Sequence, residues 1–107
     1  MTNETEEKIG RMQLLEQNIQ NLLMQKHQFQ SQLVEIRSAL EELETSETSY
    51  KIIGNIMVDS KKEDLKKDLE SKREMVELRV KTIEKQEEEL KEKTKKLQGE
   101  VLSEMKE

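Results

Sequence analysis

The sequence predicts a mainly α-helical fold, in which two long helices form an antiparallel coiled-coil hairpin with one short β-hairpin between them. Apolar residues recur in alternating three- and four-residue steps through both halves of the chain, which is the period of a coiled-coil seam. The pattern is interrupted near the middle of the 107 residues, where β-branched residues flank Gly54-Asn55. The composition agrees, because 40% of the residues are charged and only 32% are hydrophobic, too few for a globular core.

The first helix is predicted over about residues 5–44, a segment without proline. At ~1.5 Å per residue it would reach ~60 Å. Thr45, Ser46, Thr48 and Ser49 follow it, and their side chains compete for backbone hydrogen bonds, so the helix is expected to end there. Lys26 fills one seam position, and the others hold Met12, Leu15, Ile19, Leu22, Phe29, Leu33, Ile36, Leu40 and Leu43.

Residues 50–58 predict a β-hairpin, because Gly and Asn tolerate the positive φ angles that two-residue turns require. Its strands are apolar on both faces, and such a hairpin is marginally stable alone in water. A connector between helices does not need these exposed apolar residues, and an unpaired apolar edge is an aggregation hazard. We therefore predict an assembly surface at Tyr50, Ile52, Ile53, Ile56, Met57 and Val58.

The second helix is predicted over about residues 60–105. Ser60 and Glu63 have the spacing of a capping box, which places the helix start at Ser60. One set of seam positions holds Leu69, Val76, Ile83, Leu90 and Leu97, and the companion set holds Arg73, Val80, Glu87, Thr94 and Val101. The run Glu87-Glu88-Glu89 is interpreted as part of a solvated face. Outer-face ion pairs of ~0.3 kcal/mol each are expected for Glu63 with Lys67, Glu77 with Lys81, Glu87 with Lys91, Glu89 with Lys93 and Glu92 with Lys96.

The two seams match each other if the chain folds back at Gly54-Asn55. Opposed residue numbers then add to 109 and bring together Leu40 and Leu69, Leu33 and Val76, Phe29 and Val80, Ile19 and Leu90, and Met12 and Leu97. This agreement favours one intramolecular hairpin over two separate dimerising helices. Gly10 falls opposite Gly99, and each glycine costs its helix ~1 kcal/mol relative to alanine. The end of the hairpin that carries both termini is therefore expected to fray.

That end has more apolar residues than one seam uses. The surplus can be ordinary widening of the stripe, or it can form a surface for varied apolar partners, because methionine side chains repack around irregular shapes. The second interpretation predicts client-binding tips at Ile9, Met12, Leu14, Val101, Leu102 and Met105.

Other functional classes find little support in the sequence. There is no cysteine, His27 has no ligand partner on its helix face, and phosphate-loop, HExxH and GxSxG motifs are absent, so neither an enzyme nor a metal or cofactor site is predicted. A net charge of −5 disfavours nucleic acid as a partner. No apolar run approaches the ~18 residues of a membrane span and no signal peptide is recognised, so a cytoplasmic protein is expected.

The order of these segments resembles the β-class subunit of prefoldin, of the archaeal type, over nearly the whole chain. The pattern Tyr-Lys-x-x-Gly-x-x-x-Val at Tyr50, Lys51, Gly54 and Val58 carries most of the resemblance. The segment Leu40-Glu41-Glu42-Leu43 before a Ser/Thr linker adds to it, and a single short hairpin is similar to the β class. Residues 1–107 would then form one prefoldin-like domain.

The resemblance implies a hexamer of two α-class and four β-class subunits whose hairpins form a β-barrel platform. It also implies an ATP-independent holdase chaperone, without cofactors, that binds unfolded proteins at its coiled-coil tips and transfers them to a group II chaperonin. The alternative is a structural coiled-coil adaptor that binds one defined partner helix and uses the hairpin only as a turn. A helical arm for nucleic acid is a third class, which the acidity of the chain disfavours.

Overall fold

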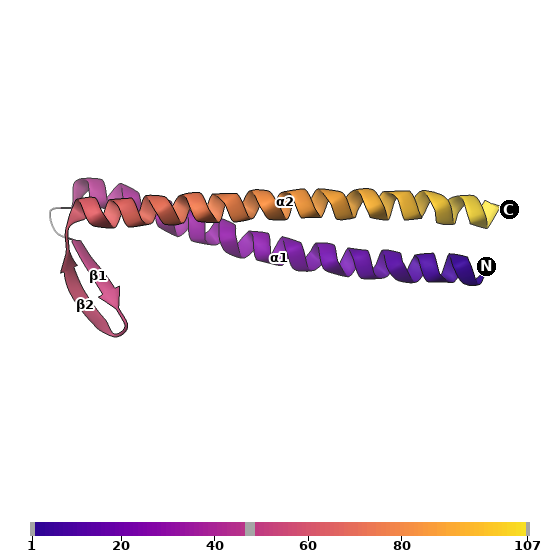
Figure 1. Cartoon of the computed structure of the whole chain (residues 1–107), viewed down its shortest axis with the longest axis horizontal. Helices are drawn as coiled ribbons and strands as arrows, with labels where there is room; N and C mark the ends of the chain where they lie inside the picture. Colours follow the sequence, from indigo (N-terminus) through magenta and orange to yellow (C-terminus); the bar gives the residue numbers. More distant parts are fainter. Residues whose placement is uncertain (1, 47–48, 107) are drawn as a thin grey trace. The chain divides into compact units, whose positions relative to one another are not determined.

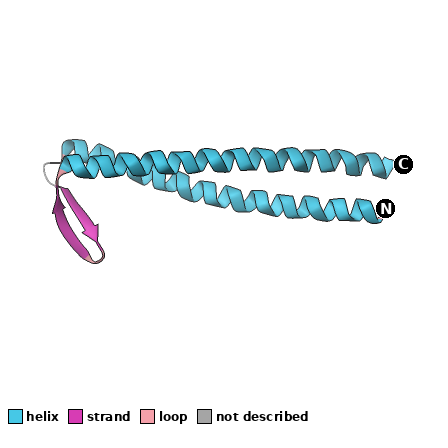
Figure 2. Ribbon diagram, viewed as in Figure 1, coloured by secondary structure: helices cyan, strands magenta, loops and turns pink. Residues whose placement is uncertain are grey.

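The computed structural model describes residues 2–46 and 49–106. Along the chain it forms helix α1 (Asn3–Thr45), strands β1 (Ser49–Ile53) and β2 (Ile56–Ser60), and helix α2 (Lys62–Lys106). The chain divides into two compact units, one of Met1–His27 with Lys81–Glu107 and one of Gln28–Val80. Within each unit an α1 segment runs antiparallel to an α2 segment, and the strands belong to the second unit (Figure 1). The predicted class, two long helices with a short β-hairpin between them, is confirmed (Figure 2).

Helix α1 begins and ends at polar residues that satisfy its free backbone groups. The Thr2 hydroxyl accepts a hydrogen bond from the Thr5 amide at 3.1 Å, and the Thr2 carbonyl accepts from the Glu6 amide at 3.1 Å, so Thr2 is the N-cap. At the other end the Thr45 hydroxyl donates to the Glu42 carbonyl at 3.2 Å. The helix therefore ends where Thr45 and Ser46 predicted it, while Thr48 lies outside the described residues.

The hairpin has the predicted two-residue turn. Strands β1 and β2 pair antiparallel from Ser49 opposite Ser60 to Ile53 opposite Ile56, which leaves Gly54 and Asn55 as the turn. Gly54 has a φ of 60°, and no other described residue has a positive φ. A positive φ at the first turn position alone is typical of a type II′ turn, which prefers glycine there.

Helix α2 begins later than the sequence predicted. Ser60 is the last residue of β2, where its carbonyl accepts a hydrogen bond from the Ser49 hydroxyl at 2.6 Å. The first helical bond runs from the Leu65 amide to the Lys61 carbonyl at 3.1 Å, so Lys61 holds the N-cap position. The predicted capping box at Ser60 is wrong, because strand pairing holds this residue in extended backbone.

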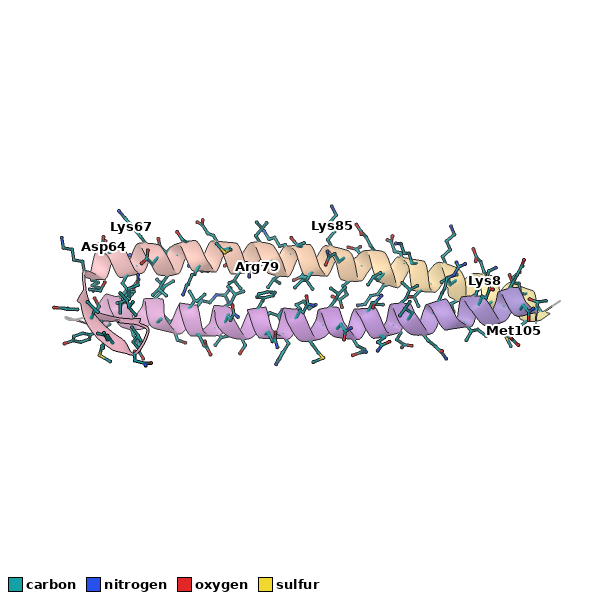
Figure 3. All side chains as sticks on the ribbon, turned by 60° about the horizontal axis from the view of Figure 1, so that its bottom comes forward. Lys8, Asp64, Lys67, Arg79, Lys85 and Met105 are labelled. Carbon is teal, nitrogen blue, oxygen red and sulfur yellow. The ribbon has the colours of Figure 1, made fainter. Side chains whose placement is uncertain are left out.

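The seam of the second unit packs as predicted. Leu33, Ile36, Val76 and Val80 form its buried core, against which Phe29, Leu40 and Leu69 pack. The predicted pairs at residues 40 and 69, 33 and 76, and 29 and 80 all fall within this cluster. The guanidinium of Arg79, which is labelled in Figure 3, lies 5.6 Å from the centre of the Phe29 ring, a cation–π distance.

The seam of the first unit continues to the first turns of α1 and the last turns of α2. Ile19, Ile83 and Val101 are buried in it. The Thr5 hydroxyl donates to the Glu104 carboxylate at 2.6 Å, and these two residue numbers add to 109, the sum predicted for opposed residues. Helix α1 runs through Gly10 and helix α2 through Gly99 without a break. The fraying of this end stays a prediction.

The outer faces contain fewer ion pairs than the sequence predicted. Of the five expected pairs within α2, only Glu87 with Lys91 lies within 4.0 Å in the described part of the chain, at 3.2 Å. Glu77 instead approaches Arg73 and Arg37, at 3.9 Å each. Exposed charged side chains lose rotamer freedom when they pair, and the gain of 0.2–1 kcal/mol in such pairs is often too small to hold them together.

Candidate assembly and client-binding surfaces

The β-hairpin is apolar on both faces. Residues directly opposite each other in an antiparallel pair point to the same face, so Tyr50, Ile52 and Met57 share one face. Ile53, Ile56 and Val58 share the other. All six side chains are exposed, with 41 to 68% of their surface accessible. The six residues predicted for assembly are therefore placed together on one exposed element.

The base of the hairpin is anchored, in contrast to its exposed apolar side chains. Ser49 is buried and donates to the Ser60 carbonyl, and the Lys51 ammonium lies 3.5 Å from the Asp68 carboxylate in α2. Only two strands pair in the sheet that the structure describes, so each strand has an outer edge with free backbone donors and acceptors. This geometry can accept further strands on both edges.

The six residues predicted for client contact differ in exposure. Leu14, Leu102 and Met105 are exposed, and Figure 3 shows Met105 near the end of α2. Ile9 and Met12 are half-buried. Val101 is only 7% exposed because it occupies the seam, so it stabilises the helix pair from inside and is not offered to a partner.

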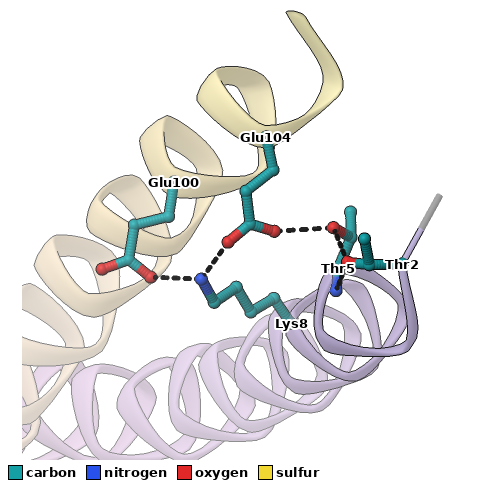
Figure 4. A network of polar contacts seen from close by, with 5 residues as sticks. All are labelled: Thr2, Thr5, Lys8, Glu100 and Glu104. Carbon is teal, nitrogen blue, oxygen red and sulfur yellow. Dashed lines mark hydrogen bonds and ion pairs between the residues drawn. The ribbon is translucent and has the colours of Figure 1, made fainter. Parts of the chain in front are cut away.

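A polar network joins the two helices beside these residues (Figure 4). The Lys8 ammonium donates to one Glu104 oxygen and lies 3.4 Å from the Glu100 carboxylate. The other Glu104 oxygen accepts from the Thr5 hydroxyl, which also contacts the hydroxyl of the N-cap Thr2 at 2.8 Å. The start of α1 is thus tied to the last turns of α2 by groups that the sequence prediction did not use.

The network makes the helix pair sensitive to acid. The hydrogen bonds from Lys8 and Thr5 hold the pKa of Glu104 below its ordinary value of 4.5. Likewise, the hydrogen bond to Glu104 raises the pKa of Lys8. A carboxylate with a lowered pKa adds stability above pH 4.5 and loses it as the pH falls through the folded pKa. For Lys8 the added stability is present below pH 10.5 and is lost above it.

We therefore expect the melting temperature to fall as the pH is lowered below 4.5, and to fall less in Glu104→Gln. Circular dichroism followed through thermal unfolding measures this. Glu74→Gln is the control, because Glu74 is exposed in the middle of α2, forms no ion pair in the described residues, and should behave like the unaltered chain. Equal acid sensitivity of Glu104→Gln and the unaltered chain would contradict the role of the network.

A buried ion pair lies in the seam of the first unit, where the sequence predicted a solvated acidic run. Glu87 is only 6% exposed, and its carboxylate accepts from the Lys26 ammonium of α1 at 3.0 Å. Its second oxygen lies 3.2 Å from Lys91. The hydrogen bond from Lys26, followed by that from Lys91, lowers the pKa of Glu87. The prediction of a solvated face is therefore wrong at Glu87, although Lys26 and Glu87 both occupy seam positions of the heptad pattern.

Two other features of the described residues bear on function. They contain no group of three or more His, Asp or Glu side chains placed to hold a metal ion, and His27 is exposed on α1. None of the described helices has a stretch long and apolar enough to cross a membrane.

Known proteins share this combination of hairpin and helices. A family model described as "Prefoldin subunit" matches residues 6–107. Prefoldin subunit beta of Archaeoglobus fulgidus is 40% identical over 88 residues, which cover 79% of this chain and 76% of that protein. Its counterpart in Methanospirillum hungatei is 36% identical over 100 residues, which cover 91% of this chain and 83% of that protein.

A solved structure agrees with these relatives. The crystal structure of the prefoldin beta subunit from Thermococcus strain KS-1 superposes with a TM-score of 0.91 at 30% identity, and covers 95% of this chain and 92% of that one. The family resemblance carried by Tyr50, Lys51, Gly54 and Val58 is therefore confirmed. The chain belongs to the prefoldin family, as a subunit of the β class.

Proposed function

We propose that this chain assembles through its β-hairpin into a hexamer of two α-class and four β-class prefoldin subunits. The observation that carries the proposal is the exposure of apolar residues on both hairpin faces, together with the free edges of both strands. Each copy contributes two strands, and joining the hairpins into β-barrels pairs the edges and covers one face. Tyr50, Ile52, Ile53, Ile56, Met57 and Val58 make the contacts.

The assembled complex is an ATP-independent holdase for unfolded proteins in the cytoplasm. Clients bind to exposed apolar residues of the first unit, Leu14, Leu102 and Met105, with Ile9 and Met12 at their margin. Met105 and Met12 adapt to clients of different shape because the unbranched side chain has three rotatable bonds. Bound clients pass to a group II chaperonin.

Truncation tests the client-binding part of the proposal. A chain that lacks residues 1–11 and 98–107, mixed with an α-class partner, is expected to form the same hexamer but to lose suppression of aggregation. The lost segments contain most of the exposed apolar residues of the tips, whereas the hairpin is intact. Light scattering of a chemically denatured client measures suppression, and native mass measures assembly.

A substitution variant separates loss of surface from loss of structure. Leu14→Ser with Leu102→Ser and Met105→Ser keeps the chain length and removes three exposed side chains, and it should also lose most of the suppression. Val34→Ser with Met75→Ser removes exposed apolar side chains elsewhere and should suppress normally. Undiminished suppression by the truncated complex would show that clients bind elsewhere.

A further inference from the structure

The first unit contains a groove that combines apolar and cationic side chains. It has a volume of about 420 Å³ and lies between α1 and α2. Leu14, Leu15 and Leu97 form its apolar lining, and Leu14 is exposed. The charged residues that line it are Arg11, Lys93, Lys96 and Glu100.

The charge of this groove is one-sided. Glu100 is its single acidic lining residue and lies 3.4 Å from Lys8, which also binds Glu104. Arg11, Lys93 and Lys96 have no carboxylate within 4.0 Å among the residues that the structure describes. A chain with a net charge of −5 therefore presents three cations and one carboxylate around an apolar surface.

A second groove of the same unit shows that an excess of cationic lining residues is not a general property of the helix pair. It has a volume of about 570 Å³ and is lined by Met12 and Ile19 with Glu16, Lys91 and Lys95. There Lys91 is held by Glu87 at 3.2 Å, and Glu16 supplies a negative charge. Its charges are mixed, so it offers no preference for one sign.

We propose that the groove lined by Leu14, Leu15 and Leu97 binds apolar segments of unfolded clients that carry Asp or Glu directly beside the apolar run. This rests on the proposed holdase function and adds a preference among clients. The leucines bury the apolar run, and the long stems of Arg11, Lys93 and Lys96 extend that surface while their charged ends reach the flanking carboxylates. Complementary charge selects partners mainly by favouring one sign and disfavouring the other.

Binding of model peptides to the full-length chain in complex with an α-class partner tests this preference. Three fluorescent peptides share one Leu/Phe core and differ only in their flanks, which are Glu, Ser or Lys. The Glu-flanked peptide is expected to bind about three- to tenfold more tightly than the Lys-flanked one at low salt, because exposed ion pairs are individually weak. The difference should shrink as salt is added. The negative net charge of the chain alone would produce the opposite order.

Paired variants locate the preference. Lys93→Gln with Lys96→Gln should bind the Glu- and Lys-flanked peptides equally. Lys67→Gln with Lys85→Gln makes the same change of charge at residues that do not line the groove and that point away from the neighbouring helix in Figure 3, so it should keep the preference. Fluorescence anisotropy measures all affinities.

The possible outcomes separate this inference from the function on which it rests. Equal binding of all three peptides by the unaltered complex overturns the charge preference and leaves the holdase function standing. Equal loss of preference in both variant pairs overturns the assignment to this groove. Failure of every peptide to bind overturns both. Self-association of the chain that Lys93→Gln with Lys96→Gln removes overturns the client preference of this groove, since a second copy would then occupy it.

Discussion

Replacement of Ile52 and Ile56 by serine is expected to abolish assembly with an α-class partner while both helices stay folded. Ile52 lies on the face with Met57 and Ile56 on the face with Val58, and both are exposed within the single chain. Their loss therefore costs the free chain little. In an assembly each isoleucine that becomes buried contributes about 1.5–3 kcal/mol, repeated in every copy. Native mass by light scattering should fall from hexamer to single subunits, with unchanged helical circular dichroism.

The matched control is Val34→Ser with Met75→Ser, which removes two exposed apolar side chains of the same unit outside the hairpin and should leave the native mass unchanged. An unchanged mass for Ile52→Ser with Ile56→Ser would favour the coiled-coil adaptor, in which the hairpin is only a turn between helices. The experiment thus separates the two functions that the sequence allowed.

Lys26→Met is expected to lower the free energy of unfolding by about 1–3 kcal/mol, because it removes one partner of a buried carboxylate. Glu87 is 6% exposed and would keep only Lys91, which lies 3.2 Å away on the same helix. Methionine has a similar length to lysine and good helix propensity, so the change isolates the ion pair. Urea unfolding followed by circular dichroism measures the loss.

The double change Lys26→Met with Glu87→Leu should recover most of this stability, since replacing both members of a buried pair by apolar side chains is often neutral or favourable. Lys85→Met is the control, because Lys85 is exposed and forms no ion pair in the described part of the chain, and it should cost less than about 0.5 kcal/mol. Equal stability of Lys26→Met and the unaltered chain would show that the seam does not depend on the pair.

The elements and the packed seam of this chain could be predicted from the sequence because they depend on local periodicity. Leu33 and Val76 lie in one core because each occupies a heptad position and the chain reverses at Gly54-Asn55. The turn follows from residue types that accept unusual backbone angles, and the exposure of Ile52 and Ile56 follows from a two-stranded sheet with no covering layer. The exposed apolar surface of the hairpin was therefore predictable to the residue, and its role in assembly stays a prediction.

The details that failed depend on competition between neighbouring interactions. The Ser60 side chain could cap a helix, but the backbone of Ser60 pairs with Ser49 in the sheet and therefore stays extended. Glu87 belongs both to an acidic run and to the seam. Its burial depends on pairing with Lys26 of the other helix, which the pattern of the run alone does not reveal. Val101 likewise lies in the seam, so it is buried and is not part of the exposed surface proposed for clients. Composition of a run says nothing about which of its members face inward.

The ion pair between Lys26 and Glu87 also bears on which helices can pair with each other. Two copies of α1 aligned in parallel as a zipper would bring Lys26 against Lys26, and two copies of α2 would bring Glu87 against Glu87. Both arrangements would bury like charges in an apolar seam, whereas α1 folded against α2 of its own chain joins opposite charges at 3.0 Å. We therefore expect the pair to disfavour parallel homodimers of either helix relative to the hairpin formed within one chain.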